Sequence, residues 1–422
     1  MVPTTKQSFA AILFSLLLCS PLQSMAVSEE TDNSSEQQAG GAEDSGAAGI
    51  ESEDELDELE RDDRQVQKTS KEIEKRSTLP ILTNVLIEAK NSSIKITATD
   101  LDLIFTNLTN NIKIYTEGST TTSASVIYDI VRKLPSGSEI NFNLVNENKL
   151  QLESEKSKFN LLCLSPKDFP LVDENFNDNE FTIDSKSMLK LLNKSKFSIS
   201  NDETRHYLNG VFLHQTEHDK NYFLTAAATD GHRMSISKIR LNSKINFESI
   251  ILPRKTIYQL VTLLVDQEAT IKICNIKSKI KFEFDNNILI SKLIDGKFPN
   301  YIQVIPKTNE KKLEINVDNF LSSVDRVASV STDRKEGVKF QLSKNIIKLS
   351  VNNPLSGDGS ETLEAKFDHE LNISFNSKYL IDVASQINGE KIIFYLNETG
   401  SPALIKDPVD KDSIFVIMPM KA

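Results

Sequence analysis

The chain of 422 residues has no tryptophan, and it has few histidines and cysteines, five and three respectively. Three cysteines in a chain of this length cannot provide the disulfide framework that stabilises many small secreted domains. No two cysteines form a Cys-x-x-Cys pair, so a cysteine-based zinc site is not expected. Cys163 and Cys274 lie in apolar, strand-like segments and are predicted to be buried thiols.

Motifs that carry catalytic chemistry are also missing. The 14 glycines are scattered, so no glycine-rich loop can cradle a phosphate, and no Gly-x-Ser-x-Gly elbow occurs. The segment 229–232 places an aspartate near a histidine, but its Asp-Gly step is typical of a turn. His214 and His218 flank Gln-Thr-Glu and are expected in a turn between strands, where a metal site is disfavoured. The sequence predicts no catalytic residue, no cofactor and no metal.

Only one long apolar run is present, from Phe9 to Leu18. It follows Lys6 and precedes the small residues around Ala26, which is the pattern of a secretory signal segment over residues 1–27. The run is too short to cross a membrane, and no other stretch of 18 apolar residues occurs. Residues 28–69 are rich in Glu, Asp, Ser and Gly, and we expect them to be disordered.

The negative charge is confined to one part of the chain. Residues 1–75 carry the whole net charge of −11, and residues 76–422 are neutral overall. Any binding to nucleic acid must therefore depend on local clusters of Lys and Arg. Lys186, Lys190 and Lys194 recur on one face of a predicted helix, where they either contact phosphates or are simply solvated.

A threefold repeat follows the acidic segment. Residues 79–103, 206–234 and 336–358 each read as a strand, a polar turn and a second strand, with apolar residues at alternate positions. Later in each repeat an apolar strand precedes a proline, and Pro170, Pro299 and Pro419 lie 129 and then 120 residues apart. A period near 125 residues is too long for a solenoid, so each repeat is a whole domain.

Amphipathic patterns between the strands predict short helices, several of which start near an Asp or Ser cap. The predicted helices span residues 125–134, 185–197, 253–264, 318–330 and 377–387. Helices mixed with antiparallel strands define the α+β class. The predicted domains cover residues 70–178, 179–305 and 306–422.

Seven segments in this order carry a resemblance to a known family: RSTLPILTNVLIEA, ATDLDLIF, RHYLNGVFL, ATDGHRM, ILPRKT, LIDGKFPNYIQVIP and FVIMPMK. From about Ser70 to Ala422 the chain resembles the bacterial DNA polymerase III beta sliding clamp. The resemblance implies three tandem domains of the DNA clamp fold, each with antiparallel sheets outside and two helices inside. It also implies a homodimeric ring around double-stranded DNA that tethers the polymerase and has no catalytic activity of its own.

The resemblance assigns two groups of contact residues. The DNA-binding positions are Arg76, Arg205, Tyr207, Arg254 and Lys255. The positions at the head-to-tail dimer interface are Ser329, Val330 and Arg334. A clamp must slide, so these cations are expected to contact phosphates and not base edges.

The resemblance further implies an apolar pocket between the second and third domains that binds short peptides. Its expected ligands are segments of the DNA polymerase III alpha subunit, the clamp loader and other proteins with a clamp-binding motif. Methionines at such a pocket suit a surface with many partners. The matching positions are Leu208, Thr229, Gly231, His232, Arg233, Met234, Pro299, Val304, Asn376, Tyr379, Pro402, Val416, Ile417, Met418, Pro419, Met420 and Lys421.

The N-terminus departs from the family pattern. Domain 1 of the family begins with a strand and part of a helix, and here the acidic stretch before Ser70 stands in their place. A sheet that loses a strand exposes a ladder edge and an apolar face. The family match predicts a cytoplasmic protein at the nucleoid, whereas the N-terminal segment alone predicts secretion. A second hypothesis is therefore a secreted or organelle-routed interaction protein, or a fused gene product, that keeps the clamp fold without replication function.

Overall fold

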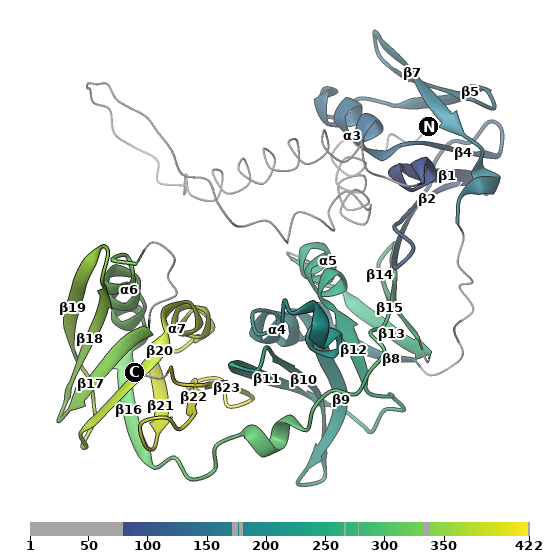
Figure 1. The fold of residues 1–422 in the computed structure, drawn as a ribbon. Helices are drawn as coiled ribbons and strands as arrows, with labels where there is room; N and C mark the ends of the chain where they lie inside the picture. The colour runs from purple at the N-terminus through teal and green to yellow at the C-terminus, as the bar shows by residue number, and fades with distance from the viewer. Residues whose placement is uncertain are drawn as a thin grey trace, which may run out of the picture. The chain divides into compact units, whose positions relative to one another are not determined.

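The computed structural model describes residues 79–170, 176, 180–265, 267–276, 278–331 and 337–420. The predicted signal segment, the predicted disordered segment and Arg76 lie outside these residues. The chain divides into two compact units, unit 1 with residues 1–175 and 282–291 and unit 2 with residues 176–281 and 292–422 (Figure 1). Both units combine antiparallel strands with helices, which confirms the α+β class.

Unit 1 contains the first repeat. Its elements are η1 (Pro80–Thr83), β1 (Asn84–Lys90), β2 (Ser93–Thr99), β3 (Leu103–Asn110), β4 (Gly118–Ser123), α3 (Ala124–Lys133), β5 (Asn141–Asn146), β6 (Lys149–Ser154), β7 (Ser157–Leu164) and η2 (Pro166–Asp168). The strand order is β5-β6-β7-β4-β1-β2-β3, and β15 (Asn287–Lys292) follows β3. Phe105 of β3 lies opposite Leu289 of β15, and both side chains are buried.

Helix α3 shows why this segment folds as predicted. The Ser123 side chain accepts a hydrogen bond from the Val126 N–H at 3.5 Å and caps the helix. Ile127 and Val131, four residues apart, are both fully buried, so one stripe of the helix packs on the strands.

Unit 2 contains most of the second repeat and all of the third. The second repeat consists of β8 (Glu180–Asp184), α4 (Ser185–Lys196), η3 (Glu203–Leu208), β9 (Gly210–His218), β10 (Asn221–Thr229), β11 (Arg233–Leu241), β12 (Ile250–Pro253), α5 (Arg254–Leu264), β13 (Thr270–Ile276), β14 (Lys279–Phe284) and β15. The chain passes into unit 1 within β14 and returns within β15.

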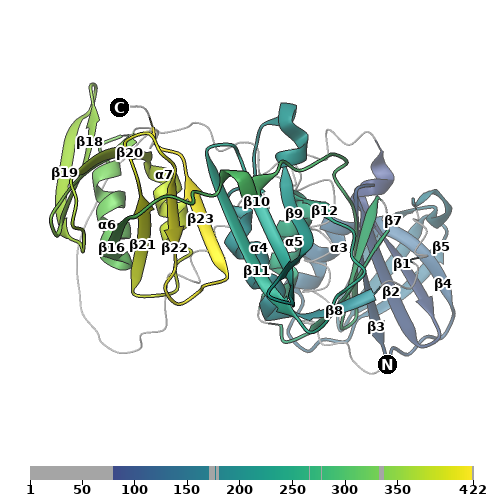
Figure 2. The same ribbon diagram turned by 90° about the horizontal axis from the view of Figure 1, so that it is seen from below.

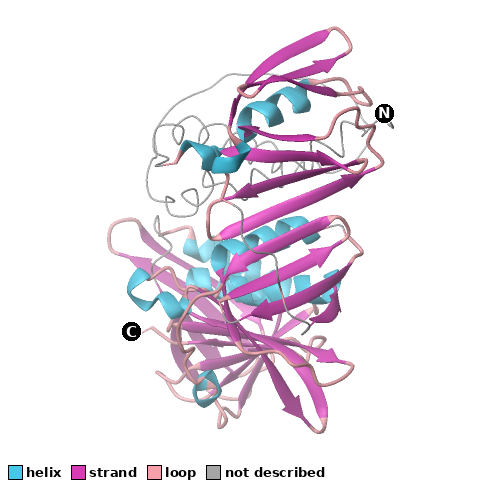
Figure 3. Ribbon diagram, turned by 90° about the vertical axis from the view of Figure 1, so that its right-hand side faces the viewer, coloured by secondary structure: helices cyan, strands magenta, loops and turns pink. Residues whose placement is uncertain are grey.

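The third repeat follows the same order. It consists of η4 (Tyr301–Val304), β16 (Lys311–Asn316), α6 (Val317–Ala328), β17 (Gly337–Ser343), β18 (Ile346–Asn353), β19 (Gly357–Glu364), β20 (Leu371–Asn376), α7 (Ser377–Ala384), β21 (Lys391–Leu396), β22 (Ala403–Lys406) and β23 (Ser413–Ile417). The predicted helices are confirmed, with ends displaced by three residues or fewer. Figure 3 shows the helices of unit 2 lying against its strands.

One continuous sheet joins the second and third repeats. Its order is β12-β9-β10-β11-β23-β22-β21-β16, with β11 beside β23 (Figure 2). Met234 of β11 lies opposite Val416 of β23. A second sheet of unit 2 has the order β19-β18-β17-β20. In the core of the third repeat, Phe340 meets Phe320, Phe375 and Phe394 edge-on at 5.9, 5.3 and 6.0 Å. These contacts fix α6 against both sheets.

The histidine pair is not in a turn, so that prediction is wrong. His214 and His218 both lie on strand β9. The His214 ring stacks on Phe212 with centroids 4.4 Å apart, and its Nε2 lies 3.0 Å from the Tyr301 hydroxyl. No group of three metal-ligating side chains occurs within the described ranges. Burial lowers the pKa of His214 to about 4 and raises the pKa of Tyr301 to about 12.

We expect His214 to make the stability of unit 2 depend on pH. Because its pKa falls from 6.5 to about 4 on folding, the unfolded chain binds the proton more tightly. The free energy of unfolding is therefore unaffected by His214 protonation above pH 6.5, and it decreases as the pH falls towards 4. Between pH 7 and pH 4.5 the expected decrease is about 2 kcal/mol. Urea unfolding of parent and His214→Phe at both pH values measures this difference.

The matched control is His218→Gln, on the same strand, where the side chain is 73% exposed. His214→Phe should lose the part of the pH dependence that is due to His214, and His218→Gln should retain that part. Equal pH dependence in the parent and His214→Phe would contradict the prediction.

Candidate functional site

Several of the predicted pocket residues lie where the second and third repeats join. Leu208, Met234 and Val416 belong to one buried apolar cluster that also includes Phe298 and Tyr301. Around this floor several apolar side chains stay open to solvent: Ile302 is 54% exposed, Val304 52%, Met418 37% and Met420 38%. A buried apolar floor with an exposed apolar rim is typical of a groove that accepts apolar side chains.

The C-terminal residues lie at one side of the predicted groove. The Met418 N–H donates to the His232 carbonyl at 2.8 Å, and the Met420 N–H donates to the Ser374 carbonyl at 2.8 Å. A Cβ added to Gly337 would lie 3.2 Å from the Met420 sulfur, so the chain approaches closely there. The tail therefore crosses from the second repeat to the third, and Lys421 lies outside the described residues.

Arg233 links the second repeat to the third beside the predicted groove. Its side chain is 9% exposed, its Nε donates to Asp230 Oδ2 at 3.0 Å, and its Nη1 donates to Asp382. The guanidinium also lies 4.4 Å from the centre of the Tyr379 ring. A charge this buried needs such partners, because an unpaired one would be strongly destabilising. Arg233 therefore ties β11 to α7 and fixes the position of Tyr379.

Tyr379 lies on the third repeat's side of the groove. It follows Asn376, whose side chain accepts the Tyr379 N–H at 3.3 Å and caps helix α7. Burial, and then the negative charge of Asp230, raise the pKa of the Tyr379 hydroxyl. The hydroxyl therefore stays protonated at neutral pH and can donate a hydrogen bond.

The segment 229–232 is a turn, as predicted. The Asp230 carboxylate accepts the His232 and Arg233 N–H groups, both at 2.9 Å, and Gly231 has a φ of +92°. The same carboxylate binds the Arg233 guanidinium, so it is occupied by structural contacts. The first repeat has the same turn, where Asp100 accepts the Leu103 N–H at 2.7 Å.

The prediction of one exposed lysine face on α4 is wrong for Lys194. Lys194 is 5% exposed, and its amine donates to the Gln386 carbonyl and to Asn388 Oδ1. Lys190 donates to the buried Asp410 at 2.7 Å. Burial lowers the pKa of Lys194. These two lysines therefore fasten the second repeat to the third, and no local pattern in the sequence signalled the acceptors, which lie about two hundred residues away.

Four of the five predicted DNA-binding residues lie on two elements that are linked to each other, η3 and α5. Arg205 and Tyr207 are in η3, and Arg254 and Lys255 begin α5. The Arg254 N–H donates to the Asn209 carbonyl at 3.2 Å, which links the two elements. Arg254 Nη2 donates to the Ser200 carbonyl at 2.8 Å, and burial lowers its pKa. Arg254 therefore also stabilises the loop that carries η3.

Two of the three predicted interface residues can be placed. Ser329 follows α6, and the Val330 carbonyl accepts a hydrogen bond from the Ser356 hydroxyl. A Cβ on Gly359 would lie 2.8 Å from Val330 Cγ2, so Val330 packs directly on β19. Arg334 lies outside the described residues.

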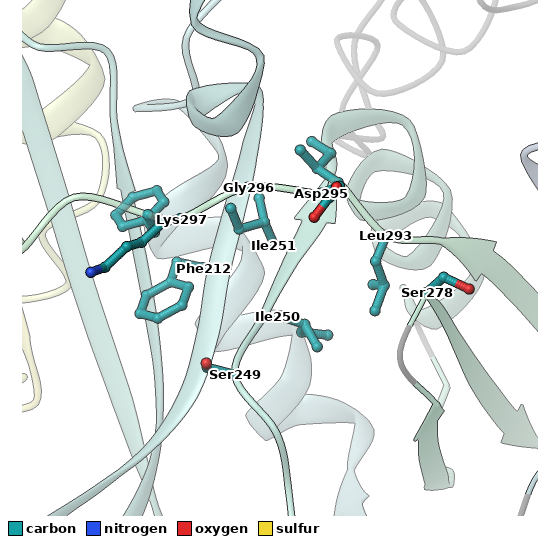
Figure 4. Close-up of a pocket in the computed structure, with 11 residues that line it drawn as sticks. Phe212, Ser249, Ile250, Ile251, Ser278, Leu293, Asp295, Gly296 and Lys297 are labelled. Carbon is teal, nitrogen blue, oxygen red and sulfur yellow. The ribbon is translucent and has the colours of Figure 1, made fainter.

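The second repeat also holds a cavity of about 650 Å³ that sequence reasoning missed (Figure 4). Phe212, Ile251, Leu293 and Phe298 give it an apolar lining, and Asp295 and Lys297 stand at its side. None of the predicted pocket residues lines it. Its lining comes from four separate segments, which explains why no single motif indicated it.

Comparisons with known proteins agree on one family. The profiles of the DNA polymerase III beta subunit match residues 60–173 (N-terminal domain), 182–300 (central domain) and 302–421 (C-terminal domain). The beta sliding clamp of Caulobacter vibrioides is 35% identical over 352 residues, which are 83% of this chain and 94% of the relative. That of Escherichia coli K12 is 32% identical over 347 residues, 82% of this chain and 93% of the relative.

Solved structures give the same result. A sliding clamp from Bartonella birtlesii bound to griselimycin has a TM-score of 0.79 and 39% identity, covering 83% of this chain and 94% of that one. The Caulobacter crescentus clamp has a TM-score of 0.80 and 35% identity, with the same coverage.

Three tandem α+β domains of this kind, two of which share one sheet and an apolar cluster at their joint, define a DNA clamp. The chain belongs to the DNA polymerase III beta subunit family. It is a sliding-clamp processivity factor and not an enzyme by itself, and the comparisons do not favour the alternative of a non-replicative interaction protein. No helix within the described ranges is both long and apolar enough to cross a membrane.

Proposed function

We propose that two copies of this chain close into a ring around double-stranded DNA, and that the groove binds peptides of the DNA polymerase III alpha subunit, the clamp loader and other clamp-motif proteins. The ring works in the cytoplasm, at the nucleoid. The observation that carries this proposal is how the repeats pair their strands.

One strand of each of the first two repeats pairs with the last strand of the next repeat; β11, for example, is the fourth strand of the second repeat. In unit 1, β3 pairs antiparallel with β15, and in unit 2, β11 pairs antiparallel with β23. By the same rule β19, the counterpart of β11, should pair with the last strand of another repeat, and β7, the last strand of the first repeat, should receive such a strand. Within the described residues β19 pairs only with β18, and β7 pairs with β4 through Cys163 and Leu164 alone. In two head-to-tail copies, β19 of each copy would pair with β7 of the other, and neither strand edge would remain unpaired.

The side chains along these edges suit an interface. Leu162 of β7 is 85% exposed, which is costly for a leucine in water. Asp358 and Glu364 of β19 are exposed and acidic, while Lys156, in the turn before β7, and Lys158, on β7, are exposed and basic. Val330, which packs on β19, and Ser329 belong to the same surface. Closure by β19 and β7 would bury the leucine and bring opposite charges together.

The proposal predicts a topological hold on DNA. Loaded onto a nicked circular plasmid by a clamp loader, the chain should stay bound through gel filtration and should be lost when the plasmid is cut once. Lys255→Glu should weaken this retention several-fold at physiological salt, because it replaces a phosphate-binding charge with a repulsive one. The matched control is Lys348→Glu, an exposed lysine on β18 of the outer sheet, which should change little.

Two results would contradict the proposal. The first is equal retention on circular and linear plasmid, which would mean that no ring encloses the DNA. The second is an equal effect of the two charge reversals, which would remove Lys255 from the DNA-binding residues.

A further inference from the structure

Helices α3 and α5 carry a tyrosine at the same position. Residues 127–131 of α3 read Ile-Tyr-Asp-Ile-Val, and residues 257–261 of α5 read Ile-Tyr-Gln-Leu-Val. Each helix directly follows a strand, β4 or β12, and Tyr128 and Tyr258 are both the fifth residue of their helix. The isoleucine before each tyrosine is fully buried, whereas both tyrosines are partly open to solvent. The two tyrosines therefore occupy equivalent places in the first and second repeats.

A cation lies over each ring, but the two cations come from different elements. In α3, the guanidinium carbon of Arg132 lies 5.5 Å from the centre of the Tyr128 ring, one helical turn further on. The matching residue of α5 is the neutral Thr262. Here the cation is Lys196, the last residue of α4, whose amine lies 5.7 Å from the centre of the Tyr258 ring. Two different residues thus place a positive charge over the same helix position, which indicates a role for the charge itself.

The surroundings of Lys196 include no anion. Lys194, two residues earlier, donates to the Gln386 carbonyl and to Asn388 and ties α4 to the third repeat. Residues two apart point to nearly opposite sides of a helix, so Lys196 faces α5 instead. It is partly buried, burial lowers the pKa of its amine, and no carboxylate pairs with it in the part of the chain that the structure describes. A cation–π contact offsets such burial only modestly, so an external anion would stabilise this amine further.

Lys196 also lies beside two of the predicted DNA-binding residues. Its carbonyl accepts the Ile199 N–H at 3.3 Å, and the Ile199 carbonyl in turn accepts Arg254 Nη2 at 3.3 Å. Lys255 and Tyr258 are three residues apart on α5 and therefore share one face of the helix. The end of α4 and the first turns of α5 thus gather three cations around one tyrosine.

We propose that the two tyrosine–cation pairs, Tyr258 with Lys196 and Tyr128 with Arg132, each bind a backbone phosphate of double-stranded DNA. The cation meets the phosphate, and the ring holds the cation in place, so each tyrosine is a positioning residue. Phosphate contacts carry no sequence information, which suits a protein that slides. Asp129 lies 3.5 Å from Arg132 in a partly exposed ion pair, and such pairs are weak enough for a phosphate to replace them. This role rests on the proposed DNA binding and adds four residues that the family resemblance did not assign.

The salt dependence of DNA binding by the full chain tests the two cations. Fluorescence anisotropy with a short labelled duplex gives the binding constant K over a range of salt concentrations. Each phosphate contact contributes about 0.9 to the slope of log K against log salt concentration, so Lys196→Met and Arg132→Met should each reduce the slope by about that amount. Lys196→Arg, which keeps the charge, should retain the parent's slope. The matched control is Lys348→Met on β18, an exposed lysine of the outer sheet, which should also retain it.

The positioning role of the ring is tested by Tyr258→Leu. This substitution should weaken binding several-fold in the parent but have little effect in Lys196→Met, because the ring acts through the amine. Thermal unfolding should show that every variant remains folded.

The anisotropy measurement needs neither a clamp loader nor a closed ring, so its result is separate from that of plasmid retention. Slopes of Lys196→Met and Arg132→Met equal to the parent's would overturn the phosphate contacts, whether or not the plasmid experiment supports the ring. An equal reduction in Lys348→Met would also overturn them, because the effect would then follow total charge. If Tyr258→Leu weakens binding equally with and without the Lys196 amine, the ring does not position that amine. A parent chain that does not bind the duplex at any salt concentration would contradict the proposed DNA binding and, with it, these contacts.

Discussion

Deletion of residues 418–422 should abolish binding of a short Gln-x-x-Leu-Phe peptide while the fold survives. The deletion removes Met418 and Met420, which lie at the predicted groove and are 37% and 38% exposed. It also removes the two backbone hydrogen bonds that carry the tail across the joint, but it leaves the buried strand β23 intact. Losing the apolar contact of two methionines costs about 3 kcal/mol or more, which is at least ~100-fold in affinity. Fluorescence anisotropy with a labelled peptide measures the change.

The matched control is Leu355→Ser, which removes an apolar side chain that is 98% exposed on the third repeat but far from the groove. This variant should bind the peptide with the parent's affinity, and thermal unfolding should show that both variants remain folded. Unchanged affinity in the folded deletion variant would place the peptide site elsewhere, and the cavity beside Phe212 would then be the next site to examine.

Replacing Leu162 with aspartate should convert the proposed dimer to monomers at micromolar concentration. A ring of two copies has two identical β7–β19 interfaces, so each substitution acts twice. Each interface would lose about 1.5 kcal/mol or more of apolar burial and would place a carboxylate beside the acidic residues of β19. The sum of at least ~3 kcal/mol raises the dimer dissociation constant by ~100-fold or more. Sedimentation velocity over a range of concentrations gives this constant.

Val265→Asp serves as the control, because Val265 is 49% exposed at the end of α5 and lies on neither edge strand. The control should sediment like the parent. If Leu162→Asp remains as firmly dimeric as the parent, β7 is not part of the interface, and the strand-pairing rule does not extend between chains.

Local signals in the sequence determined the class, the repeats and most of the elements. Helices α4, α6 and α7 begin after Asp184, Asn316 and Asn376, whose side chains cap the first turn. The turn at 229–232 follows from its Asp-Gly step. Capping and turn formation involve residues two or three apart, so the sequence alone contains the information. The family motifs likewise remained in order along the chain and led to the matching family.

Contacts between distant residues decided what these local signals could not. The sequence presents Lys190 and Lys194 as a charged helix face, yet their partners lie about 190 to 220 residues further on, and the fold buries Lys194. The same holds for Arg233, which needs Asp382 from the third repeat, and for His214, which needs Tyr301. The free energy of a buried charge or ring depends on which groups surround it. Only the tertiary structure brings those groups together, and so only it decides which polar residues hold the domains and which remain open to a ligand.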